Sequence, residues 1–236
     1  MNLIKVKAIV IRETTYKEND KIITLLTDSL GKISCIARGS KRTNSPLLAS
    51  SQYLVYSEFV LYKSKKFYYV NSAEVINTFY NLRVDFDKLN KIFEMTKIIN
   101  NVTDENQDTN SILKLFLNTI YAIDTFDKDI NLLIAIFKIK LFSILGFAPR
   151  VSVCANCNND LENNEIYYDY IQNAFFCNNC THEDKRRYIK ISNATLIAIR
   201  YVIASEIKKV FSFELKDTSD FKLFGQVFAD AMTSGI

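Results

Sequence analysis

The stretch Cys154-Ala-Asn-Cys157 is followed, nineteen residues later, by Cys177-Asn-Asn-Cys180. Two Cys-x-x-Cys pairs at this separation can present four thiolates to one point, because each pair forms a tight knuckle that directs both sulfur atoms the same way. Four thiolates complete a tetrahedral shell and leave no coordination position for water, as in structural zinc sites. The stretch therefore predicts a zinc ribbon in which these four cysteines bind a structural Zn²⁺.

The residues between the two pairs fit a small antiparallel ribbon. Residues 166–170 alternate apolar and polar side chains, residues 172–174 predict a turn, and residues 175–176 lead back to the second pair. His182, two residues beyond the last of these cysteines, is a substitute ligand. A redox dithiol pair and a set of buried core cysteines are the alternatives to a metal site. The fifth cysteine, Cys35, fits a buried apolar position.

The composition is that of an ordinary globular protein. Of the 236 residues, 48% are apolar and 24% are charged, and this length suits two or three compact units. The first seven residues lack the apolar run of a signal peptide, so we expect a cytoplasmic protein, in which paired cysteines bind metal more often than they form disulfides. The most hydrophobic run, residues 130–145, contains two lysines and is too short to span a bilayer, so no membrane partner is expected.

The positive charge is concentrated at the N-terminal end of the chain. Residues 1–80 contain twelve Lys and Arg against six Asp and Glu, residues 81–153 contain nine against nine, and residues 154–236 contain nine against eleven. A polyanionic partner is therefore expected to bind the first eighty residues.

Short runs rich in β-branched and aromatic residues predict five strands before residue 80. The expected strands are 5–12, 21–27, 32–38, 54–62 and 67–75. Five strands in this length suit an OB-type barrel, whose loops and one face accept single-stranded nucleic acid. A small SH3-like barrel has similar strand spacing and is the alternative.

After the barrel the hydrophobic period changes to that of helices. The expected helices are 85–101, 111–123, 130–145, 192–210 and 219–232. Because the cysteine segment interrupts them in sequence, we expect the ribbon to project from one helical body. The predicted fold class is α+β, with a barrel at 1–80, helical segments at 81–153 and 183–236, and the ribbon at 154–182.

The motifs of common enzyme classes are absent from the sequence. The chain contains one histidine and no Gly-rich phosphate loop, so a histidine-based triad or a nucleotide-binding loop is not expected. Asp124, Asp127 and Asp129 lie between two predicted helices, where helix capping in a solvated loop is the favoured interpretation over cation binding. We expect no enzymatic activity.

Two basic loops at the barrel are typical of nucleic-acid binding. Arg38, Lys41 and Arg42 follow the third predicted strand, and Gly39 lets the backbone turn there. A second loop holds the cations Lys63, Lys65 and Lys66.

The second loop immediately precedes three aromatic residues, 67–69. Cations that follow a phosphate backbone beside rings on which bases stack are what sequence-independent binding of single strands requires. Rings in a strand also pack in cores, which is the alternative for these aromatics. A weaker basic cluster, residues 185–187, fits a solvated face.

These features, taken in order, resemble a known family, the RecO DNA repair and recombination mediators of bacteria. The resemblance covers nearly the whole chain. It rests on residues 8–12, 16–27, 31–32, 37–39 with 41–42, then 142–149 and both cysteine pairs.

The resemblance implies an OB domain, a helical domain and a zinc ribbon. It also implies a cytoplasmic, nucleoid-associated protein that binds single- and double-stranded DNA and anneals complementary strands. The implied protein partners are RecR, the acidic C-terminal tail of single-strand binding protein and, indirectly, RecA. For this chain it assigns Arg38, Lys41 and Arg42 to DNA and the four cysteines to zinc.

Two departures from the family pattern affect these assignments. The neutral residues 43–46 stand where the family continues with basic ones, so we expect DNA contact that is either weaker or carried by Lys63, Lys65 and Lys66. The segment after Phe211 matches poorly, so the site for the binding-protein tail is not placed. The alternative function is a zinc-ribbon adaptor that binds proteins and does not contact DNA directly.

Overall fold

The computed structural model describes residues 2–65, 67–162, 164–181 and 187–234. The chain forms two compact units, Met1–Lys114 and Leu115–Ile236. The domain boundaries expected at residues 80, 153 and 182 stay a prediction. In the described part of the chain, no helix combines the length and the apolar character that crossing a membrane requires.

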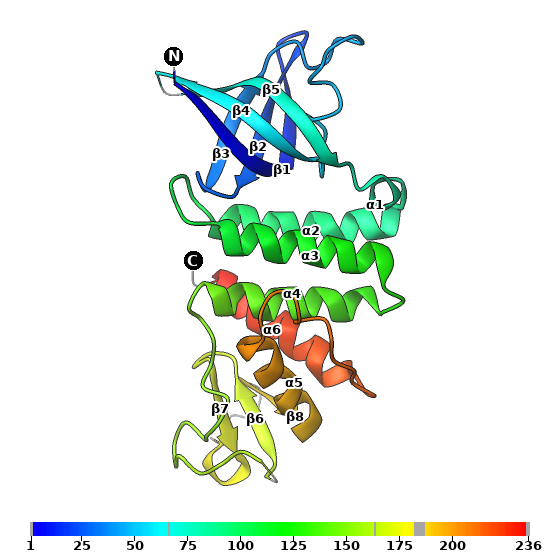
Figure 1. Ribbon diagram of the computed structural model, residues 1–236. Helices are drawn as coiled ribbons and strands as arrows, with labels where there is room; N and C mark the ends of the chain where they lie inside the picture. Colours follow the sequence, from blue (N-terminus) through cyan, green and yellow to red (C-terminus); the bar gives the residue numbers. More distant parts are fainter. Residues whose placement is uncertain (1, 66, 163, 182–186, 235–236) are drawn as a thin grey trace. The chain divides into compact units, whose positions relative to one another are not determined.

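The first unit contains a closed five-stranded barrel, drawn in blue to cyan in Figure 1. Its strands are β1 (Leu3–Tyr16), β2 (Asp20–Thr27), β3 (Lys32–Ala37), β4 (Tyr56–Ser64) and β5 (Phe67–Asn77). They close in the order β1-β2-β3-β5-β4. The pair β3–β5 is parallel, and the other pairs are antiparallel. The predicted barrel, and with it the α+β fold class, is confirmed.

The barrel forms because alternate residues of its strands are apolar and point inward. In β4 the buried positions Ser57, Phe59 and Leu61 alternate with more exposed ones. Irregular register in β1, between Val10 and Arg12, and in β4 helps the strands to curve. The inward side chains form one core cluster, which includes the predicted buried Cys35.

Several strand ends differ from the sequence-based prediction. The fourth strand was expected at 54–62, but β4 begins at Tyr56, since Leu54 takes the left-handed conformation at φ 65°, and ends at Ser64. The first strand was expected to end at Arg12, but β1 continues to Tyr16 because the pairing with β2 runs to the tight turn at Lys17. Residues 12–16 are all exposed, so they lack the apolar alternation that marks a strand. β3 ends at Ala37, so Arg38 belongs to the loop that follows.

After the barrel, the first unit contains the helices α1 (Tyr80–Val84) and α2 (Phe86–Val102). The Asp85 side chain accepts a hydrogen bond from the backbone N–H of Lys88 and caps α2, as predicted. Helix α2 is held against the loop that precedes β4 through the hydroxyl groups of Tyr53 and Thr96, which are 2.8 Å apart. The five-residue α1 was not predicted, because it is too short to show a period.

The second unit combines helices with a small sheet (Figure 1). Helix α3 (Asn110–Thr125) enters this unit, followed by α4 (Ile130–Ile144), α5 (Asn193–Ala204) and α6 (Ser219–Ser234). The sheet has the order β7-β6-β8, formed by β6 (Ile166–Asp169), β7 (Ala174–Cys177) and β8 (Tyr188–Ile191), with the short helix η1 (Asn178–Cys180) after β7. Strand β8 was not predicted.

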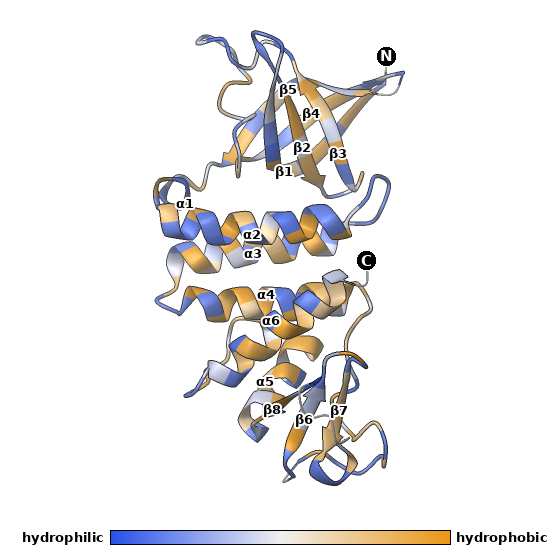
Figure 2. Ribbon diagram, turned by 180° about the vertical axis from the view of Figure 1, so that it is seen from behind, coloured by the Kyte–Doolittle hydropathy of each residue, from blue (hydrophilic) through white to orange (hydrophobic). Residues whose placement is uncertain are grey.

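Helix α4 is the centre of this unit's core. Every residue from Leu132 to Phe142 is buried, and Figure 2 shows α4 mainly in orange, interrupted by blue. Gly225 of α6 lies against Ala135 of α4, where an added Cβ atom would stand 2.8 Å from the Ala135 side chain. Small residues at this position therefore let the two helices approach closely.

The prediction that α5 extends to residue 210 is wrong. Helix α5 ends at Ala204 because Ser205 takes an extended conformation. The ammonium group of Lys140 donates to the backbone carbonyls of Ile203, at 2.8 Å, and Ser205, at 2.6 Å. A cation from α4 thus satisfies the carbonyl end of α5 and complements its dipole.

Candidate metal centre and nucleic-acid interface

Four cysteine sulfur atoms meet at one point in the second unit. Cys154 and Cys157 lie in the loop after α4, Cys177 ends β7 and Cys180 ends η1. The sulfur atoms lie within 4.8 Å of one another, and the four thiols are free. A tetrahedron of sulfur atoms about 2.3 Å from a zinc ion has edges of about 3.8 Å. The Cys157 and Cys177 sulfur atoms are 3.8 Å apart, so the spacing fits a four-thiolate metal site.

Backbone hydrogen bonds build the first knuckle without a regular strand. The N–H of Cys154 donates to the carbonyl of Asn159 at 2.9 Å, and the N–H of Asn158 donates back to the carbonyl of Cys154 at 3.0 Å. An isolated antiparallel bridge joins Val153 and Asp160. The N–H of Ala155 donates to the carbonyl of Phe175 at 2.9 Å, which ties the knuckle to β7. The first pair is therefore brought to the second pair by the sheet.

The electrostatics of the cluster favour a cation. Burial opposes ionisation of the Cys154 thiol, but the backbone N–H groups of Cys157, Cys177 and Asn156 outweigh burial and lower the pKa of Cys154 to about 6. Burial raises the pKa of Cys177 to about 12, and the neighbouring sulfur atoms add to this effect. Thiolates this close repel one another, and metal binding requires that they all lose their protons. The donor set therefore fits a thiolate-binding divalent ion, which supplies the missing positive charge.

The acidic residues 124–129 do not form a second metal centre. The Asp129 carboxylate accepts from the backbone N–H of Asn131 at 2.9 Å and pairs with Lys222 at 2.8 Å. The hydrogen bond from Lys222 lowers the pKa of Asp129. Within the described ranges, the four cysteines are the one group of three or more potential ligands close enough to share an ion. The substitute ligand His182 lies outside those ranges.

The cations of the first predicted DNA loop leave the barrel together after β3. Gly39 adopts the left-handed conformation at φ 65°, and its N–H donates to the Asp20 carboxylate at 2.8 Å. The N–H of Lys41 donates to the carbonyl of Asn19, and that of Arg42 donates to the carbonyl of Gly39, both at 3.0 Å. These bonds hold the basic loop against the β1–β2 hairpin.

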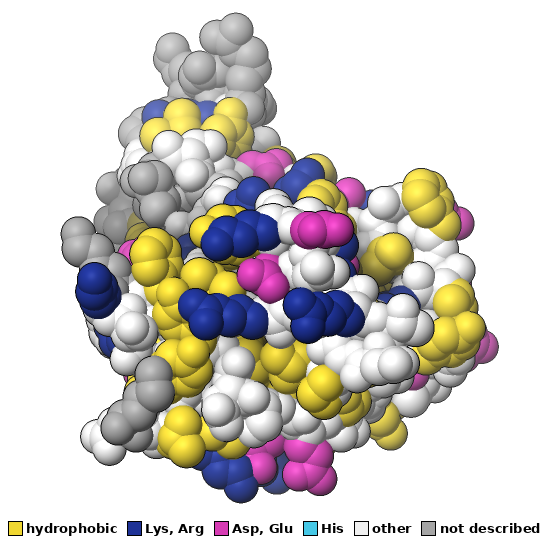
Figure 3. Space-filling view, turned by 90° about the horizontal axis from the view of Figure 1, so that it is seen from above, with side chains coloured by type: hydrophobic (Ala, Val, Ile, Leu, Met, Phe, Trp, Pro, Cys, Tyr) yellow, Lys and Arg dark blue, Asp and Glu magenta, His cyan; other side chains and the backbone are white. Residues whose placement is uncertain are grey.

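The charged groups of this loop remain accessible. The side chains of Arg38, Lys41 and Arg42 are exposed, and in the part of the chain that the structure describes none of them forms an ion pair. The Arg42 side chain passes 3.8 Å from the Cβ position of Gly39, which keeps it beside the turn. Figure 3, which looks down onto the barrel, shows Lys and Arg side chains gathered among hydrophobic and uncharged ones, with a few acidic side chains between them.

An aromatic pair orders Arg38. Its guanidinium carbon lies 4.8 Å from the centroid of the Tyr69 ring, and Tyr69 stacks on Tyr62 with centroids 5.2 Å apart and planes 10° from parallel. Tyr62 and Tyr69 are partners in the β4–β5 register and therefore share a face of the barrel. The role of Tyr62 was missed in the sequence, where only knowledge of the register would reveal it.

The second basic loop is less available than the first. The ammonium of Lys63 lies 3.3 Å from the Glu105 carboxylate and 4.6 Å from the centroid of the Tyr68 ring. The hydrogen bonds with Tyr68 and Glu105 raise the pKa of Lys63. Lys65 is exposed with φ 54°, and Lys66 lies outside the described residues.

The two basic loops use different faces of the barrel wall. Tyr68 is 5% exposed and belongs to the barrel core, so it is not a surface on which a base can stack. Neighbouring strand residues point to opposite faces. Lys63 therefore accompanies the inward Tyr68, whereas Arg38 accompanies the outward Tyr69.

A third cation and ring, both missed in the sequence, lie in the β1–β2 hairpin. The Lys17 ammonium is 5.4 Å from the centroid of the Tyr16 ring, and Tyr16 is 37% exposed. This hairpin is the one that holds the basic loop through Asn19 and Asp20. The signal available in the sequence was an aromatic residue followed directly by a lysine, between the first two predicted strands.

Comparison with known proteins assigns the family. Residues 1–79 match the family model described as "Recombination protein O N terminal". Residues 83–224 match the model described as "Recombination protein O C terminal". This matched range includes both cysteine pairs. The chain belongs to the RecO family. The resemblance seen in the sequence is therefore confirmed.

Proteins of the RecO family from several bacteria are similar over most of their length. The DNA repair protein RecO of Acetivibrio thermocellus is 38% identical over 218 residues, which cover 92% of this chain and 86% of that protein. The proteins of the same name from Caldicellulosiruptor saccharolyticus and Alkaliphilus metalliredigens are 31% and 30% identical, and the chain covers 84% of each. The two family models together cover the barrel, the cysteine segment and the helical part of the chain as far as residue 224.

Proposed function

We propose that this RecO-family chain is a DNA-binding mediator of DNA repair and recombination that needs no covalent chemistry. Its barrel binds DNA strands through the loop of Arg38, Lys41 and Arg42, and complementary single strands anneal because their charge is reduced when they are bound. With RecR, the chain then helps to load RecA. We place this activity in the cytoplasm, at the nucleoid.

The observation that carries this proposal is the exposure of three cations on one ordered loop. None of the three has an acidic partner among the described residues, whereas Lys5 and Lys63 of the same barrel do. Accessible cations release counterions from a phosphate backbone, which is the main source of sequence-independent affinity. Tyr69 holds the Arg38 guanidinium in place and so reduces the entropy lost when it binds a phosphate.

Salt dependence tests the proposal. Three phosphate contacts give a slope of about −2 in log affinity against log salt for single strands, because each contributes about −0.7. Affinity for a labelled oligothymidylate should then fall about 20-fold between about 50 and 200 mM salt from this loop alone. The triple variant Arg38→Ala, Lys41→Ala, Arg42→Ala should flatten the slope by about 2 in fluorescence anisotropy.

A matched control removes the same charge from cations that are already paired. Lys5, Lys91 and Lys190 pair with Glu58, Glu94 and Glu165, so their combined replacement by alanine should change the slope much less. Equal slopes for the two triple variants would show that net charge, and not this loop, determines binding. No binding by the unmodified chain at moderate salt would instead favour the protein-binding adaptor.

We propose Zn²⁺ as the ion of the four-cysteine site. The residues that would hold it are Cys154, Cys157, Cys177 and Cys180, and the bound ion would hold the two knuckles together without a position for water. The 3.8 Å sulfur separation and the free thiols support this assignment. Metal analysis of the purified chain should find about one zinc ion per chain. The variant Cys177→Ser should lose this bound zinc.

The protein partners proposed for this chain are those that the RecO family implies: RecR, the acidic tail of single-strand binding protein and, indirectly, RecA. Family membership supports them. Annealing of complementary strands coated with single-strand binding protein, measured with and without this chain, tests whether the chain works on the coated substrate. A rate unchanged by the chain would contradict the mediator role even if naked DNA is bound.

A further inference from the structure

The first metal knuckle has a weaker framework of its own than the second. Cys177 lies in β7 and pairs in register with Ile166 of β6. The segment around Cys154 has no strand, and its two arms are joined by the isolated bridge between Val153 and Asp160 and by the backbone hydrogen bonds of Cys154. The arms of this loop therefore depend more on contacts from outside the sheet than the second knuckle does.

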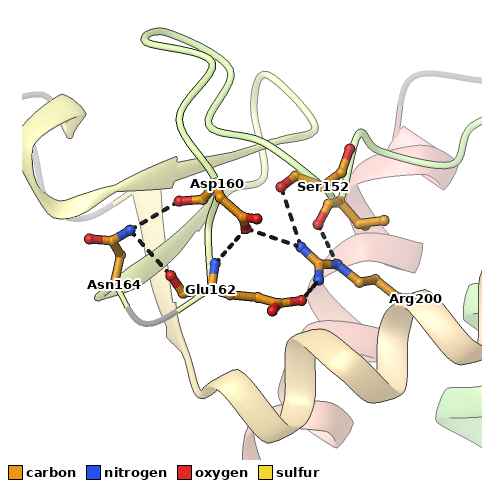
Figure 4. Close-up of polar contacts among 6 residues, drawn as sticks. Ser152, Asp160, Glu162, Asn164 and Arg200 are labelled. Atoms are coloured by element: carbon orange, nitrogen blue, oxygen red, sulfur yellow. Dashed lines mark hydrogen bonds and ion pairs between the residues drawn. The ribbon is translucent and has the colours of Figure 1, made fainter.

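Arg200 of α5 contacts both arms (Figure 4). On the incoming arm, its Nε donates to the carbonyl of Val151 at 2.8 Å, and a terminal nitrogen donates to the carbonyl of Ser152 at 3.3 Å. On the outgoing arm, its guanidinium pairs with the carboxylates of Glu162 and, at 3.9 Å, Asp160. One planar group thus joins residues that flank the first knuckle on each side.

The outgoing arm is stiffened so that it presents these carboxylates. The Asp160 carboxylate accepts from the backbone N–H of Glu162 at 2.8 Å. The Asn164 side chain donates to the carbonyls of Asp160, at 3.0 Å, and Glu162, at 3.4 Å. Figure 4 shows the Asp160 and Glu162 carboxylates directed toward the guanidinium, with Asn164 on the side of this arm away from Arg200. The Arg200 side chain is 25% exposed, whereas the carboxylates of Glu162 and Asp160 are 51% and 71% exposed. The bond to the Val151 carbonyl is therefore better shielded from water than the two ion pairs.

We infer that Arg200 is a positioning residue of the metal site, which clamps the stem of the first knuckle and thereby couples metal binding to helix α5. The guanidinium is suited to this role because its planar set of donors can bind carbonyls and carboxylates at once, whereas a lysine ammonium cannot span both arms. Helix α5 is itself held by Lys140 at its C-terminal end, so the clamp connects the knuckle to the buried α4. This inference rests on the proposed zinc site.

Metal release measures the clamp directly. Groups that hydrogen-bond directly to metal ligands typically change metal affinity about 10–100-fold. Arg200 contacts residues beside the cysteines and not the cysteines themselves, so its effect should lie at the lower end of that range. In the full-length chain loaded with zinc, Arg200→Met should speed transfer of zinc to a chromogenic chelator by about 10-fold. Arg200→Lys, which keeps the charge, should recover only part of the loss, and Glu162→Gln should release zinc faster than the unmodified chain.

A control separates positioning from general stability. Lys190→Met removes the ion pair with Glu165 on the same ribbon without touching the first knuckle, and should leave the release rate within about twofold. Loss of Arg200 should also lower the melting temperature more in the zinc-loaded than in the metal-free protein, because the clamp and the metal act on the same loop.

Two outcomes would overturn the inference. One is a release rate within about twofold of the unmodified chain for both Arg200 variants. The other is an equal loss of melting temperature with and without zinc, which would make Arg200 a purely structural residue. A chain that binds no zinc at all would refute the proposed metal site instead, so the two failures are distinguishable.

Discussion

Replacement of Gly31 by alanine should destabilise the first unit more than the same change at Gly39. Gly31 turns β2 into β3 at φ 74°. A Cβ atom added there would lie 2.4 Å from the carbonyl oxygen of Asp104 and 2.9 Å from the backbone nitrogen of Gln107. These are backbone atoms, so the loop that follows α2 must move to make room.

The magnitude follows from what that movement breaks. The N–H of Lys32 donates to the carbonyl of Asp104, and the N–H of Asn106 donates to the carbonyl of Leu30, both at 3.0 Å. Each such bond contributes about 0.5–1.5 kcal/mol. A left-handed conformation costs a residue with a Cβ atom about 1–2 kcal/mol more. Gly31→Ala should therefore lower the free energy of unfolding by about 2–5 kcal/mol.

Gly39→Ala supplies the matched control. Gly39 has φ 65°, and its added Cβ atom would meet only the Arg42 side chain at ordinary contact distance, 3.8 Å. Only the backbone cost of about 1–2 kcal/mol applies there. Urea titrations of the full-length variants, followed by far-ultraviolet circular dichroism, give the two values. Equal losses for the two variants would refute the reasoning, because the close approach at Gly31 would then have no energetic weight.

Two further predictions concern single lysines. Lys63→Met should change the salt slope of single-strand binding much less than Arg38→Ala, which should reduce it by about 0.7, because Glu105 already pairs with Lys63; anisotropy titrations check this, and equal effects would contradict it. Burial lowers the pKa of Lys140 below its ordinary 10.5, so the unfolded chain binds more protons between the two pKa values. The stability advantage of the unmodified chain over Lys140→Met should therefore grow as the pH rises toward about 10.5. Denaturant titrations across that range measure it, and a constant or shrinking advantage would contradict a lowered pKa of Lys140.

The barrel was predictable because its strands carry an alternating pattern over most of their length. The prediction was incomplete where that pattern stopped, at residues 12–16 of β1, which are paired but exposed. The predicted end of α5, at residue 210, was wrong for a different reason. The apolar stripe continues past Ala204 in the sequence, but a lysine more than sixty positions earlier takes the carbonyls at that end.

The sequence alone determined the type of each long element and the pairing of two sulfur atoms within each Cys-x-x-Cys knuckle, because both depend on spacings of a few residues that covalent geometry controls. The sheet brings the two knuckles together across nineteen residues, through the bond from the N–H of Ala155 to the carbonyl of Phe175. Tertiary structure alone decided which cations are accessible. Lys63 meets Glu105 across 42 positions and Arg200 meets Glu162 across 38, so no local pattern reports these pairs. The physical reason is that charge pairing depends on the distance between side chains in space, and only the folded chain determines that distance.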